Sequence, residues 1–146
     1  MVILSKFAEN LSALMVEQNL NPPALAKILK TDRTNITRYL RGERLPNFHG
    51  FIAIADYFGV SADLLLGKTD YASEQNFLSL PPFGDNLRKV MQENKITQYR
   101  LEKDLNLSGS VVYNWLTNRS FPSIEKVVKL ADYMDCSVDY LLGRTN

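Results

Sequence analysis

The apolar residues of this chain recur with the spacing of α-helices. In the first segment Phe7, Leu11, Leu14 and Met15 fall three or four positions apart or adjoin, which places them on one face of a helix. No part of the sequence shows the sustained alternation of apolar and polar residues that is typical of strands. The pattern therefore predicts an all-α protein.

Residues that cap helices divide the first half of the chain into five predicted helices. Asn21, Asp32, Asn47 and Ser61 are residue types whose side chains accept hydrogen bonds from the first turn of a helix. Glycines that favour helix ends follow the third and the fifth segments. Together these signals predict helices at residues 6–18, 21–29 and 33–41, a fourth from residue 48, and a short fifth at 61–67.

The second half of the chain repeats the first at a constant offset of 76 positions. Laying residue 7 on 83, and so on to residue 70 on 146, needs no gap, and 19 of the 64 positions are identical. A unit of this length can bury a core of its own. We therefore predict two domains of one fold, at residues 1–70 and 83–146, with a linker at 71–82. The apolar residues Phe77, Leu78 and Leu80 predict that this linker packs on one or both domains.

The third predicted helix has two different faces. At about 100° per residue, its apolar residues gather on one side and its polar residues on the other. The polar side carries Thr34, Thr37, Arg38 and Arg41, flanked by Arg33 and Asn35. A merely solvated helix face would have the same composition. However, only a few residues separate this helix from the preceding one, and a tight helix-turn-helix places its second helix in the major groove of DNA.

This arrangement resembles the Cro and phage lambda repressor class of helix-turn-helix proteins, the XRE family. In the first unit the resemblance rests on LAKIL (25–29), RTNITRY (33–39), RGERLPN (41–47) and FIAIADYFGVSADLLLG (51–67). In the second unit it rests on ITQYRLEKDL (96–105), WLTNRSFPS (115–123) and KVVKLADYMDCSVDYLLG (126–143). It implies two tandem five-helix lambda repressor-like DNA-binding domains that cover nearly the whole chain.

Both units depart from the family's pattern at informative positions. The glycine that is usual at a left-handed position of the turn is Lys30 in the first unit and Asn106 in the second, and lysine there is strained by about 1 kcal/mol. A small residue inside the second helix is Ala26 in the first unit but Glu102 in the second. Glu102 must reach solvent or find a partner, so we expect a looser or rearranged packing around it. The glutamine that the family sets against the DNA backbone occurs only in the second unit, as Gln98.

The helix geometry and the resemblance together predict the residues that contact DNA. For the first head, which is the outward face of the third helix with the loop after it, they are Arg33, Thr34, Asn35, Thr37, Arg38, Arg41 and Arg44. For the second head they are Gln98, Ser110, Val111, Tyr113, Asn114, Thr117 and Arg119. Arginine and asparagine offer paired hydrogen bonds to guanine and adenine edges. Because the second head is poor in the cations that attract phosphate, it is either another DNA reader or a surface for a protein.

These features predict a sequence-specific transcriptional regulator of bacteria or phage, most simply a repressor, which binds double-stranded operator DNA. The alternative is a regulator whose second copy is a module for protein interaction or dimerisation, as in antitoxins or antirepressors. Twelve extended linker residues span at most about 40 Å, and half-sites one turn of DNA apart lie about 34 Å apart. One chain can thus act as an intramolecular pseudo-dimer, and a homodimer is the other arrangement that we expect.

Composition excludes several other classes of protein. One cysteine and one histidine cannot build a zinc site, a disulfide framework or a redox pair. No apolar run approaches the roughly 18 residues of a membrane span. We therefore expect a cytoplasmic protein that is not an enzyme, with no metal, cofactor or small-molecule ligand. The net charge of +1 does not argue against nucleic acid, because the position of the charges decides.

Overall fold

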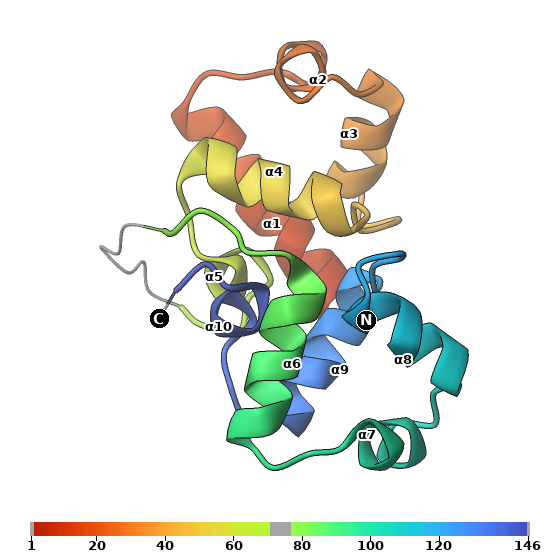
Figure 1. Cartoon of the computed structure of the whole chain (residues 1–146). Helices are drawn as coiled ribbons and strands as arrows, with labels where there is room; N and C mark the ends of the chain where they lie inside the picture. The colour runs from red at the N-terminus through yellow and green to blue at the C-terminus, as the bar shows by residue number, and fades with distance from the viewer. Residues whose placement is uncertain (1, 71–76, 146) are drawn as a thin grey trace. The chain divides into compact units, whose positions relative to one another are not determined.

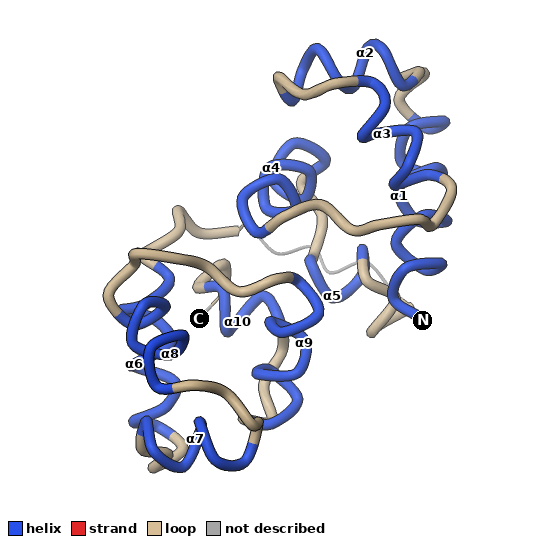
Figure 2. The backbone as a smooth tube through the Cα atoms, turned by 90° about the vertical axis from the view of Figure 1, so that its right-hand side faces the viewer, coloured by secondary structure: helices blue, strands red, loops and turns tan. Residues whose placement is uncertain are grey.

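The structure, a computed structural model, describes residues 2–70 and 77–145, and these residues form helices joined by loops (Figure 1). No strand occurs within these two ranges (Figure 2). The predicted all-α class is confirmed. The chain divides into two units, Met1–Gln75 and Asn76–Asn146. Of the predicted linker, residues 77–82 thus lie in the second unit, whereas 71–76 fall outside the described residues.

The first unit consists of α1 (Val2–Glu17), α2 (Pro22–Leu29), α3 (Arg33–Leu40), α4 (Phe48–Phe58) and α5 (Ala62–Leu65). Helix α1 begins four residues earlier than the predicted start at residue 6. Its additional turn carries Ile3 and Leu4, which are half-buried, so the apolar surface that they remove from water favours the longer helix. Helix α3 packs against both α1 and α2.

The second unit consists of α6 (Phe83–Glu93), α7 (Gln98–Asp104), α8 (Gly109–Leu116), α9 (Ile124–Tyr133) and α10 (Val138–Leu142). Each helix from α7 to α10 is capped by a serine or threonine whose hydroxyl accepts a backbone hydrogen bond from the first turn. Asn21, Asn47 and Ser61 cap α2, α4 and α5 in the same way. Asp32 precedes α3 as predicted, but its side chain accepts no capping hydrogen bond.

The backbones of the two units turn at the same places. Ten residues with positive φ form five pairs at the offset of 76, namely Asn19 and Lys95, Lys30 and Asn106, Gly42 and Asn118, Gly59 and Asp135, and Gly67 and Gly143. The predicted left-handed turn between the two helices of the motif is confirmed, with φ of 57° at Lys30 and 53° at Asn106. Glycine is therefore not required at this turn, although lysine is strained there.

One pair of asparagines ties the first helix of each unit to its last. Asn10 Nδ2 donates to the carbonyl oxygens of Leu64 and Leu65, at 2.8 Å and 3.2 Å. In the second unit Asn86 Nδ2 donates in the same way to the carbonyls of Tyr140 and Leu141, at 3.0 Å and 2.6 Å. These carbonyls lie in the last turn of α5 or α10, and those of Leu64 and Tyr140 also accept from the amides of Gly67 and Gly143.

The chain segment that precedes α6 lies on the end of α10. The Leu78 amide donates to the Arg144 carbonyl at 2.9 Å, and the Arg144 guanidinium lies 4.1 Å from the centre of the Phe77 ring. Arg144 is fully buried, and its Nη1 donates to Asp139 Oδ1 at 2.6 Å. The predicted packing of the linker is thus confirmed for Phe77, whereas the side chains of Leu78 and Leu80 are exposed.

Candidate nucleic-acid interface

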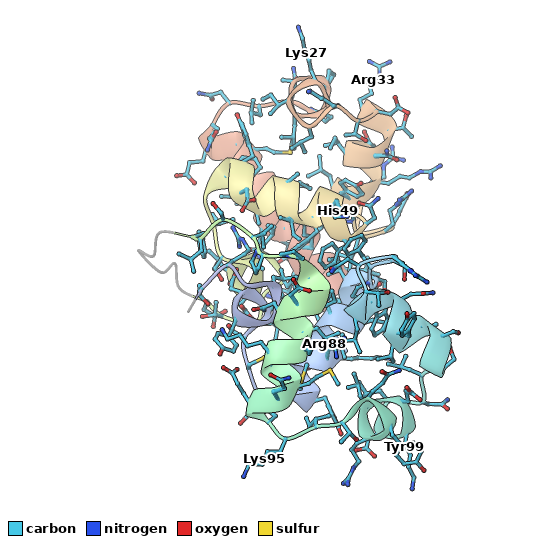
Figure 3. The ribbon with its side chains drawn as sticks, in the orientation of Figure 1. Lys27, Arg33, His49, Arg88, Lys95 and Tyr99 are labelled. Atoms are coloured by element: carbon cyan, nitrogen blue, oxygen red, sulfur yellow. The ribbon has the colours of Figure 1, made fainter. Side chains whose placement is uncertain are left out.

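Helix α3 is held by its apolar face and presents its polar face to solvent. Ile36 and Tyr39 are buried, whereas Leu40 is only half-buried. The Tyr39 ring meets the Phe7 ring of α1 edge-on, with 6.1 Å between the centroids. Burial raises the pKa of the Tyr39 phenol. Arg33 opens α3 and points away from the unit (Figure 3).

The exposed groups of the first head are mainly arginines. The predicted residues Arg33, Thr34, Arg38, Arg41 and Arg44 are all exposed. Arg41 Nη1 lies 3.9 Å from Glu43 Oε1, and the Arg44 guanidinium lies 6.0 Å from the centre of the Tyr39 ring. Because exposed pairs of this kind contribute little free energy, they do not prevent the arginines from binding another anion.

The other two predicted residues of the first head form local hydrogen bonds. Asn35 Nδ2 donates to Thr31 Oγ1 at 2.9 Å, and Thr37 Oγ1 donates to the Arg33 carbonyl at 3.0 Å. Both side chains are half-buried. Asn35 keeps its second N–H and its amide oxygen, and Thr37 keeps its methyl group and the acceptor capacity of its hydroxyl oxygen. The arginines supply the main exposed donors.

The second head has the same backbone and a different chemistry. Ser110, Val111 and Tyr113 of α8 are exposed, whereas Asn114 is half-buried. The rest of the predicted set consists of Gln98 and Thr117, which are half-buried, and Arg119, which is exposed. The stretch 107–123 contains one arginine, where the matching stretch 31–47 contains four, so the second head attracts phosphate less strongly.

Several side chains of the second head contact their neighbours. Thr117 Oγ1 donates to the Tyr113 carbonyl at 2.8 Å, and the Ser110 and Ser108 hydroxyl oxygens lie 3.3 Å apart. The Arg119 guanidinium lies 5.6 Å from the centre of the Tyr113 ring. The predicted cation of this head is thus stacked beside its exposed aromatic residue, which suits a planar partner as well as a phosphate.

A polar cluster that the sequence did not reveal joins α7 to the end of α9. The Tyr133 hydroxyl donates to Asp104 Oδ2 at 2.5 Å, and Arg100 Nε donates to the same oxygen at 2.9 Å. These two hydrogen bonds, the tyrosine's first, hold the pKa of Asp104 below its ordinary value. The spacing of Arg100 and Asp104 on one helix is a signal for their pair, but nothing local indicates Tyr133.

Glu102 reaches the surface beside the first residue of α8. The sequence predicted that this glutamate would either reach solvent or find a partner, and the first outcome is observed. The side chain is half-buried, and a Cβ built on Gly109 would lie 3.3 Å from its Oε1. Gly109, which has no side chain, leaves room for the glutamate that stands where the first unit has Ala26. Gln98 Nε2, which lies close by, donates to the Gly109 carbonyl at 3.5 Å.

Comparison with known families identifies both units. Residues 86–145 match a model described as the Cro/C1-type HTH DNA-binding domain, and residues 11–65 match one described as helix-turn-helix. The chain belongs to the XRE family. It carries two tandem Cro/C1-type helix-turn-helix domains, which are the domains of DNA-binding regulators. A search of curated proteins and one of solved structures found no match.

Among residues 2–70 and 77–145 no helix combines the length and the apolar character that a membrane span requires. In both domains the second helix of the motif, α3 or α8, packs against the helix before it, α2 or α7. The double-stranded DNA partner that the sequence predicted follows from the family.

Proposed function

We propose that this protein is a sequence-specific transcriptional repressor that binds operator DNA through both heads. The observation that carries the proposal is the basic outward face of α3, opposite the buried Ile36 and Tyr39. Such a helix fits the major groove, where guanidinium groups form paired hydrogen bonds with guanine. A protein bound at an operator within a promoter represses by excluding the polymerase.

The two heads contribute differently to this function. The first supplies four arginines, which attract phosphates and read guanine. The second offers the hydroxyl of Ser110, the amide of Asn114 and the apolar surfaces of Val111 and Tyr113, which can contact base edges and thymine methyl groups. One chain would therefore read a site without palindromic symmetry, as an intramolecular pseudo-dimer. The covalent connection raises the effective concentration of the second head once the first has bound.

Arg38→Ala is expected to weaken binding to the operator by roughly 5- to 150-fold, which corresponds to about 1–3 kcal/mol for one base-reading arginine. The loss arises because the variant removes an exposed guanidinium in the last turn of α3. Fluorescence anisotropy on the DNA fragment that the wild type protects next to its own gene measures the change. Lys129→Ala, which removes an exposed cation from α9, is the matched control and is expected to bind like the wild type. Equal affinities for wild type and Arg38→Ala would contradict the assignment of the first head.

Footprinting on the same fragment separates a protein with two reading heads from one with a single reading head. Two protected major-groove segments are expected, and Tyr113→Ala is expected to weaken protection of one of them. If Tyr113→Ala keeps full DNA affinity while Arg38→Ala loses it, the second head binds a protein instead. The exposed Val111 and Tyr113 are the observation that favours this second function.

A further inference from the structure

The second head contains a carboxylate at the position where the first head presents an arginine. Gly109 is the first residue of α8 and is exposed. A Cβ on Gly109 would lie 3.3 Å from Oε1 and 3.5 Å from Oε2 of Glu102, so the carboxylate of α7 lies beside the missing side chain. The matching residue of the first head is Arg33, which projects into solvent from the start of α3 (Figure 3). Helix α7, the first helix of the motif, thus places a side chain at the start of α8.

The Glu102 carboxylate has unused capacity to accept hydrogen bonds. Within residues 2–70 and 77–145 it forms no hydrogen bond or ion pair with another residue, although the side chain is half-buried. A carboxylate accepts hydrogen bonds only, and it is held near the start of a helix, where partial positive charge favours it. A binding partner at this position must therefore donate a hydrogen bond to the carboxylate.

The donors in the major groove are few. Cytosine presents its N4 amino group, and adenine presents its N6 amino group beside the acceptor N7. The N7 acceptor repels a carboxylate, whereas cytosine has no acceptor on the same edge. We propose that Glu102 is a specificity residue of the second head and accepts a hydrogen bond from the N4 amino group of a cytosine. This inference rests on the proposed function, because it requires α8 to lie in the major groove.

Selection from randomised DNA with the full chain tests the proposal. The wild type is expected to select two segments, with cytosine at one position of the segment that the second head protects. Glu102→Ala is expected to lose this preference by about tenfold or more and to keep the preferences elsewhere. Glu102→Gln is expected to replace cytosine by adenine, because a glutamine amide matches N6 and N7 together. Folding of Glu102→Ala is supported by the first unit, which has Ala26 at this position, and circular dichroism checks it.

Each other outcome has a distinct meaning. If Glu102→Ala leaves the selected sequence unchanged, or raises affinity equally for all sequences, the carboxylate reads no base and the inference fails while the proposed function stands. Selection of only the first head's segment also overturns the inference. If the wild type selects no sequence at all, the proposed function itself fails. Asp135→Asn, which removes an exposed carboxylate after α9, is the control for charge alone and is expected to leave the selected sequence intact.

Discussion

Asp139→Ala is expected to destabilise the second unit by about 3–5 kcal/mol, the range for removing one partner of a buried ion pair. Arg144 is fully buried, and its Nη1 lies 2.6 Å from Oδ1 of Asp139, which is also buried. A guanidinium cannot escape by losing its proton at ordinary pH, so the variant leaves a buried cation without this carboxylate. Domains of this size are stable by only about 5–15 kcal/mol, so the loss is a large fraction of the total.

The fluorescence of Trp115 measures this change in the second unit alone. Trp115 is the only tryptophan of the chain, lies in α8 and is buried. Urea unfolding followed at this residue is expected to show a much lower midpoint for Asp139→Ala than for the wild type. The double variant Asp139→Ala with Arg144→Met is expected to recover part of the loss, because it removes the buried charge as well. A double variant no more stable than Asp139→Ala would contradict the account of the ion pair.

Gly84→Ala is expected to destabilise the same unit by about 3 kcal/mol, near the upper end of the usual cost of overpacking. A Cβ at this position would lie 2.4 Å from the carbonyl oxygens of both Trp115 and Leu116. These are backbone atoms at the end of α8, so no side-chain rotation relieves the collision and α6 must move away from α8. The Gly84 amide, which donates to Asn118 Oδ1 at 2.8 Å, would move with it.

Gly109→Ala is the matched control for this prediction and is expected to change stability little. A Cβ there meets only the flexible carboxylate of Glu102, at 3.3 Å, and alanine favours a helix more than glycine does. Trp115 fluorescence in urea again measures both variants. The first unit has Ala8 where the second has Gly84, so a helix pair of this fold can accommodate a methyl group. Equal stability of Gly84→Ala and the wild type would show that the second unit relaxes to that arrangement.

The losses of stability expected for Asp139→Ala and Gly84→Ala should also change DNA binding, because α8 forms the second head. Loss of the second unit's fold removes one protected segment and leaves the contacts of the first head in place. The footprint at protein concentrations near saturation is therefore expected to shorten rather than disappear. This outcome would separate the contributions of the two heads without any change to a residue that contacts DNA.

The sequence by itself determined the all-α class and the two tandem copies, whereas the DNA-contacting residues of the two heads stay a prediction. Helical spacing of apolar residues and capping residues are local signals, because they arise within one turn or one helix. The resemblance to the family also located the left-handed turn at Lys30 and Asn106, where the family usually has glycine, and φ is positive at both residues. The start of α1 was placed too late, because the half-buried Ile3 and Leu4 stabilise a turn that has no local signal.

Only the tertiary structure decided the features that depend on residues far apart in the chain. An arginine is usually exposed, and the burial of Arg144 depends on Asp139 and on Phe77, which belongs to the predicted linker. Tyr133 meets Asp104 across 29 positions, and Gly84 meets the end of α8 across more than 30. The position of the Glu102 carboxylate depends on a residue of another helix, Gly109, because this glycine has no side chain there. Periodicity describes which face of a helix is buried, but the packing of helices determines what each face meets, and that packing is set by the whole core.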